Sequence, residues 1–202
     1  MKNAVMGIAC TVAIAWSGAG NADTVSAFLY ESGDDVIYEY MGSIDITGFV
    51  SNVSTPGVGS LNVLPNAGLI EISVSGRLRY FDIDVSGAPF GTGDVSGVQN
   101  NTVIGDSFSF ELDFDTIGLP DGYISQTPLA GSATMPNRTL AGIGADIGVY
   151  TYETTFNGNV TNTITLTVGS APPAAPVPVP AGLPMLAAGL GAVVYVKRRV
   201  QA

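Results

Sequence analysis

Apolar and polar residues alternate with a period of two through much of residues 23–170, and this pattern constrains the fold more than any other. Successive side chains of a β-strand point to opposite faces, so alternation predicts strands with one buried face. No stretch of this range has convincing helical periodicity. The alternating segments include 44–47, 70–75, 81–85, 108–115, 149–152 and 163–168.

Turn-forming residues separate these segments, and they gather at 32–35, 55–57, 91–94, 120–122 and 157–159. Many short antiparallel strands joined by regular turns are typical of a β-sandwich, with a jelly roll as one arrangement. We therefore predict an all-β fold, an antiparallel β-sandwich, for residues 23–170. Helix is expected only at the two ends, as an N-terminal signal helix and a short C-terminal membrane helix.

Charge and residue types exclude several functions. All 17 acidic residues lie between Asp23 and Glu153, a range that contains only three arginines. So acidic a domain would be repelled by the phosphates of nucleic acid, which we exclude as a partner. The chain has no histidine, which removes a Ser–His–Asp triad and histidine metal sites. The single cysteine, Cys10, precedes the domain, so a thiol nucleophile is not expected there. We predict no enzymatic activity and no cofactor.

The N-terminal 22 residues have the layout of a secretory signal. Lys2 precedes an apolar run over 4–16, and small residues fill 17–22. Gly20 and Ala22 fit the positions before a cleavage site, so we predict cleavage after Ala22. An uncleaved anchor is the alternative, but the apolar run is short for a membrane span.

The C-terminal residues form a three-part tail after a Pro/Ala linker at 171–176. An extended motif comes first, then an apolar segment to residue 196, then a basic stop. A helix over about 181–196 would span roughly 24 Å, less than the hydrocarbon core of a bilayer. The alternative is a plain anchor held by its cytoplasmic basic residues. The motif is Val177, Pro178, Val179, Pro180 and Ala181, and the basic stop is Lys197, Arg198 and Arg199.

This tail closely resembles the VPLPA-CTERM sorting signal, a variant of the PEP-CTERM class. Val179 stands where that family usually has leucine, which is a conservative change. The resemblance implies recognition of residues 177–202 by an exosortase-like membrane protease or transferase. It also implies a Gram-negative host and an association with exopolysaccharide. The middle of the chain is more weakly similar to exported domains that carry such tails, at 42–48, 90–93, 105–107 and 119–125; that similarity names no activity.

Candidate chemistry in residues 23–170 is sparse. Glu111, Asp113 and Asp115 alternate with apolar residues, which predicts carboxylates about 7 Å apart on one strand face. A solvated strand face explains them most simply, and a calcium site or a glycosidase pair are alternatives. Ordinary pairing across strands explains the tyrosines of this range, and a sugar-stacking platform is the alternative. These tyrosines are Tyr38, Tyr40, Tyr80, Tyr123, Tyr150 and Tyr152.

The sequence thus predicts an exported, non-enzymatic cell-surface or extracellular-matrix protein. It is expected to cross the inner membrane, to be anchored as a precursor, and to be sorted and cleaved at its tail. A carbohydrate- or calcium-binding β-sandwich module is the alternative.

Overall fold

The computed structural model describes residues 23–57, 59–74, 76–94, 102–156 and 159–173 of the 202-residue chain. The chain divides into two compact units, Met1–Ala171 and Pro172–Ala202, and the first unit contains every described strand. The described residues contain no α-helix and a single 3₁₀ turn, η1 (Pro65–Ala67). The predicted all-β fold is confirmed, whereas both predicted terminal helices lie outside the described residues.

The strands form two sheets. In chain order they are β1 (Asp23–Ser32), β2 (Asp35–Gly42), β3 (Val50–Gly57), β4 (Ser60–Leu64), β5 (Leu69–Ser73), β6 (Gly76–Asp82), β7 (Asp84–Ser86), β8 (Thr102–Gly105), β9 (Phe108–Glu111), β10 (Thr116–Pro120), β11 (Leu129–Met135), β12 (Gly148–Phe156) and β13 (Asn159–Val168). Sheet A has the order β7-β12-β13-β1-β2-β11-β8, and sheet B has the order β3-β6-β10-β9-β5-β4.

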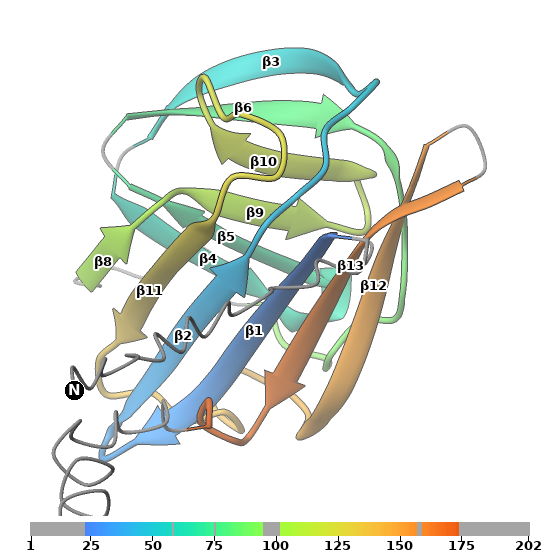
Figure 1. Cartoon of the computed structure of the whole chain (residues 1–202). Coiled ribbons are helices and arrows are strands. Elements are labelled where there is room, and N and C mark those ends of the chain that lie inside the picture. The colour runs from blue at the N-terminus through green and yellow to red at the C-terminus, as the bar shows by residue number, and fades with distance from the viewer. Residues whose placement is uncertain (1–22, 58, 75, 95–101, 157–158, 174–202) are drawn as a thin grey trace, which may run out of the picture. The chain divides into compact units, whose positions relative to one another are not determined.

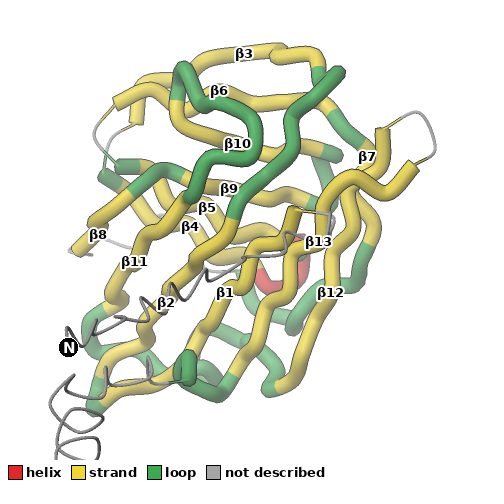
Figure 2. The backbone as a smooth tube through the Cα atoms, in the orientation of Figure 1, coloured by secondary structure: helices red, strands yellow, loops and turns green. Residues whose placement is uncertain are grey.

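The two sheets pack against each other in a β-sandwich-like arrangement. In Figure 1 the strands of sheet A run diagonally across the front, and those of sheet B lie behind and above them. Figure 2 shows the loops that join the strands, mostly at the ends of the sheets. One shared cluster of buried apolar side chains fills the space between the sheets.

Alternation explains why these segments bury one face. On β1, Val25, Ala27 and Leu29 are fully buried, while their neighbours Thr24 and Ser26 are exposed. The same period of two recurs on β2 and β13. Because side chains alternate across a strand, each segment contributes its apolar set to the core and its polar set to the outer face.

The first and last strands pair in parallel. Residues Asp23 to Leu29 of β1 lie opposite Asn162 to Val168 of β13, and every other pairing of the described strands is antiparallel. This pair departs from the purely antiparallel prediction. A tight turn can join only antiparallel neighbours, whereas the connection from β1 to β13 runs through the whole domain.

Aromatic side chains connect the two sheets. The rings of Tyr40 on β2 and Phe108 on β9 lie 4.9 Å apart, and those of Phe110 on β9 and Tyr152 on β12 lie 4.7 Å apart. All four side chains are buried. Such ring pairs add about 0.5–1.5 kcal/mol beyond the area that they bury, so β9 anchors sheet B to sheet A at two points.

Several local predictions are wrong. Residues 44–47 lie in a loop and form no strand, because their backbone N–H groups donate hydrogen bonds to side chains. Residues 81–85 are divided between β6 in sheet B and β7 in sheet A, so the chain changes sheets there. Residues 55–57 end strand β3 and do not form a turn; β3 is an edge strand of sheet B, where proline is tolerated.

Glycines allow two loops to lie in direct backbone contact. Gly91 forms an isolated bridge with Ala145, and the backbone N–H groups of Thr92 and Gly93 both donate to the carbonyl oxygen of Gly144 (2.9 and 3.2 Å). A Cβ atom at Gly93 would lie 1.9 Å from the carbonyl oxygen of Ile143. Only glycine fits there, because a backbone atom cannot turn away as a side chain can.

We expect Gly93→Ala to lower the free energy of unfolding by about 3 kcal/mol, because the loops would have to separate. Gly33→Ala is the comparison: Gly33 has a φ of +63° but open space around it, so only the left-handed backbone should cost, about 1 kcal/mol. Urea unfolding measures both. Equal effects would show that the close approach is unimportant.

Candidate functional site

The structure separates the three carboxylates named from the sequence. Strand β9 ends at Glu111, and residues 112–115 form a turn that leads into β10. The backbone N–H of Asp115 donates to the carbonyl oxygen of Leu112 (3.4 Å), and Asp115 has a left-handed φ of 50°. The prediction of one strand over 108–115 is therefore wrong. Glu111 is buried, whereas Asp113 and Asp115 are exposed in the turn.

Glu111 instead belongs to a group of polar side chains on the outer face of sheet B, the face directed away from sheet A. In the sheet register Glu71 lies opposite both Asn62 and Ser109, and Glu111 lies opposite Thr116. Directly opposed residues share a face, while Ile70, Ile72, Phe108 and Phe110 point to the core. We call this group the outer-face cluster. It consists of Asn62, Glu71, Tyr80, Ser109, Glu111 and Thr116.

Hydrogen bonds orient Glu71 within the outer-face cluster. The hydroxyl of Tyr80 donates to Glu71 Oε2 (2.9 Å), and Asn62 Nδ2 donates to Oε1 (3.4 Å). Tyr80 reaches Glu71 across Gly118, which lies between Tyr80 and Ser109 in the register. A Cβ atom at Gly118 would lie 2.4 Å from Ser109 Oγ, so this hydroxyl lies over the glycine on the same face.

Burial changes the acidity of Glu111. Its side chain is 8% exposed, and burial, followed by the charge of Glu71, raises its pKa to about 7. Arg79 forms a salt bridge with Asp121 (2.6 Å), and Arg77 bonds to Ser54. Neither arginine compensates the two glutamates.

Sequence reasoning named Glu111 and Tyr80, although it assigned them to different candidate sites, and it missed Glu71 and Ser109. Glu71 and Ser109 occupy polar positions of alternating segments, which was the available signal. Their meeting depends on the pairing of β5 with β9, and a register between distant strands cannot be read from alternation alone.

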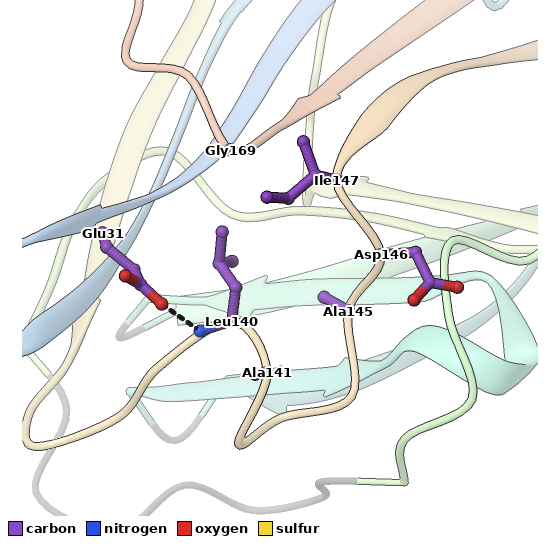
Figure 3. Close-up of a pocket in the computed structure, with 7 residues that line it drawn as sticks. All are labelled: Glu31, Leu140, Ala141, Ala145, Asp146, Ile147 and Gly169. Carbon is purple, nitrogen blue, oxygen red and sulfur yellow. Dashed lines mark hydrogen bonds between the residues drawn. The ribbon is translucent and has the colours of Figure 1, made fainter.

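A second feature is a hollow of about 460 Å³ at one end of the domain (Figure 3). Leu140, Ala145 and Ile147 line it together with two acidic residues. Glu31 Oε1 accepts a hydrogen bond from the backbone N–H of Leu140 (2.7 Å), while the side chain of Asp146 points away from Glu31. The two carboxylates therefore do not converge on a common point, and this hollow presents no acid–base pair.

The segments for which the sequence predicted a similarity to exported domains make structural contacts. Residues 42–48 and 119–125 meet: Ser125 Oγ donates to Asp45 Oδ1 (2.7 Å), and the hydroxyl of Tyr123 bonds the backbone of Ile44. Bonds from Thr47 and Ser125 lower the pKa of Asp45. Fully buried Asn162 accepts from the Asp45 N–H (2.6 Å) and donates to the Asp45 carbonyl (3.0 Å). These contacts tie both loops to β13.

Segment 105–107 is held in the same way. Ala130 N–H donates to Asp106 Oδ2 (3.0 Å), and Val74 N–H donates to Ser107 Oγ (2.9 Å). The hydroxyl of Tyr40 donates to the Asp106 carbonyl (2.6 Å). The segment therefore joins an edge of sheet A to sheet B.

The six tyrosines named from the sequence do not form one exposed platform. Tyr38, Tyr40 and Tyr152 are buried in the core. Tyr80 is bonded to Glu71, and the hydroxyl of Tyr123 donates to the Thr127 carbonyl (2.7 Å). The rings thus serve packing and hydrogen bonding.

The residues predicted to direct processing, Ala22, Val177 to Ala181 and Lys197 to Arg199, lie outside the described residues. Within the described part of the chain, no helix is long and apolar enough to cross a membrane. Nor does any group of three or more acidic, histidine or cysteine side chains there lie close enough to hold a metal ion. Comparison with protein-family models, curated proteins and solved structures found no match.

The raised pKa of Glu111 makes stability depend on pH. The folded state keeps this proton to about pH 7, whereas the unfolded state loses it near 4.5. The stability that the proton provides is therefore complete at low pH and lost as pH rises through about 7. In EDTA, we expect Glu111→Gln to gain up to about 3 kcal/mol relative to the unaltered chain between about pH 4.5 and 8. Asp113→Asn, in the exposed turn, is the control. If the unfolding free energy of Glu111→Gln changed with pH in parallel with that of the unaltered chain, the raised pKa of Glu111 would be contradicted.

Asn162 should be essential to the loop contacts. Asn162→Ala leaves the backbone N–H and carbonyl of Asp45 without their partner, which should cost about 1–3 kcal/mol in unfolding free energy. Thr163→Ala, one residue along β13 on the outer face, should change it by less than about 0.5 kcal/mol. Chemical denaturation compares the two, and a neutral Asn162→Ala would disprove the role.

Proposed function

We propose that this chain is an exported cell-surface or extracellular-matrix protein whose tail is sorted and cleaved by an exosortase-like membrane enzyme. The observation that carries the proposal is the three-part tail, with its motif at 177–181, its short apolar segment and its basic stop at 197–199. The order of these parts suits a membrane-held precursor that is cut close to the motif.

The positions of the strands are compatible with this proposal. Asp23, the residue after the predicted cleavage at Ala22, lies in strand β1, and its Oδ1 accepts a hydrogen bond from Ser43 Oγ (2.9 Å). Strand β13 ends at Val168, shortly before the Pro/Ala linker. Cleavage in both places would leave every described strand in the released domain.

The role outside the cell is non-enzymatic in this proposal, in association with exopolysaccharide. The described part of the domain is rich in acidic residues and has two glutamates close to each other. Its loops, which contain glycines and backbone hydrogen bonds, stabilise the fold. A domain with seventeen acidic residues against three arginines stays soluble through charge repulsion. A jelly-roll connection of the two sheets stays a prediction.

Replacing Pro178 and Pro180 with alanine should leave the precursor in the membrane, because the motif needs prolines that resist helix. Fractionation and immunoblotting in the native host measure the released form, and mass spectrometry locates both cleaved ends. Pro172→Ala with Pro173→Ala is the matched control, since it makes the same change in the linker outside the motif. Unchanged release of the motif variant would refute the proposal.

A further inference from the structure

Two carboxylates share the outer face of sheet B, and neither forms an ion pair with a basic residue of the described part of the chain. Glu71 and Glu111 are diagonal neighbours on the paired strands β5 and β9, since Glu71 lies opposite Ser109 and Glu111 lies two residues further along. Diagonal neighbours have Cα atoms about 7–8 Å apart, close enough for two glutamate side chains to approach a common point. Their charges act on each other, as the raised pKa of Glu111 indicates.

A buried carboxylate beside a second carboxylate needs a proton or a cation, because desolvation and repulsion both oppose its charge. Glu111 is more than nine-tenths buried. The arginines nearest in sequence to this face are engaged elsewhere, Arg79 with Asp121 and Arg77 with Ser54. A cation held between the two carboxylates would balance their charge.

A buried hydroxyl supplies a second, independent observation. Ser109 is fully buried, its Oγ has no hydrogen-bond partner, and it lies on the cluster's face between Glu71 and Gly118. A buried polar group without a hydrogen-bond partner is unfavourable, so this hydroxyl has an unused capacity to bind a ligand. In the register Ser109 is the direct neighbour of Glu71 across the strands and lies two residues before Glu111 on the same strand face, so its hydroxyl oxygen belongs to the surface that carries both carboxylates.

We propose that Glu71, Glu111 and Ser109 Oγ bind one calcium ion on the outer face of sheet B. Calcium prefers oxygen ligands and accepts variable geometry completed by water, whereas magnesium demands a near-ideal octahedron. Tyr80 and Asn62 hold the Glu71 carboxylate by hydrogen bonds, as groups behind a metal ligand commonly do. The site is independent of the sorting tail and excludes Asp113 and Asp115.

The test is calorimetric titration of CaCl₂ into the EDTA-treated, dialysed full chain in mild detergent at about pH 7.5 and constant NaCl, with melting curves in parallel. We expect one ion per chain, a Kd on the order of 10⁻⁴–10⁻³ M as in extracellular modules, and a higher melting temperature with calcium. Glu111→Gln should weaken binding more than about tenfold, since it removes a charged ligand. Asp113→Asn, the matched control, should bind as the unaltered chain does.

Ser109→Ala keeps both carboxylates and decides the matter if Glu111→Gln does not fold. It should weaken calcium binding while the circular dichroism spectrum stays that of a β protein. Absence of binding, unchanged binding in Glu111→Gln or in Ser109→Ala, or equal loss in Asp113→Asn would each overturn the site. An equal response to MgCl₂ would overturn the assignment to calcium.

Discussion

Backbone hydrogen bonds between β1 and β13 hold the beginning of the domain beside its end, and the rest of sheet A extends outward from this pair. Strands β12 and β7 lie on one side of it, and β2, β11 and β8 lie on the other. Without this pairing sheet A would fall into two parts, and the core face that Val25, Ala27 and Ile164 present to sheet B would be divided. Because the paired strands are distant in sequence, the loop-closure cost must be met before the pairing forms.

Side-chain hydrogen bonds to backbone then determine where the irregular segments lie. Asn162 is part of β13, yet it satisfies both backbone groups of Asp45 in a loop. Ser125 and Tyr123 bring a second loop to the same place. Buried backbone groups outside a sheet need such partners, so these polar residues are as necessary to the fold as the apolar core.

Alternation predicted strands well where both neighbours in the sheet are regular, as in 149–152 and 163–168. It failed where another interaction competes for the backbone. The Asp45 side chain accepts a hydrogen bond from the backbone of its own loop, so 44–47 is not a strand. The turn after Glu111 interrupts a second alternating pattern, which continues in the sequence through Phe114, although Phe114 is 69% exposed. Periodicity reports the local preference of a chain, whereas the turn depends on how β9 and β10 pair.

The outer-face cluster illustrates the same limit for the site. Glu111 was visible as one of several alternating carboxylates, but its neighbours Glu71 and Ser109 are defined by register between strands. The buried state of Glu111, and hence its raised pKa, follows from that register. Residue types and spacing could name a candidate, and only the pairing of the strands could choose its partners.

The parallel pairing of β1 and β13 also decides how the domain responds to mechanical force. In a parallel pair the start of one strand and the end of the other lie at opposite ends of the ladder, as the opposition of Asp23 to Asn162 and of Leu29 to Val168 requires. A pull between the two ends of the folded unit therefore acts along the strands. It shears many interstrand hydrogen bonds together instead of opening them one after another. A surface domain tethered at its C-terminal end and held at its other end would resist extension through this one pair of strands.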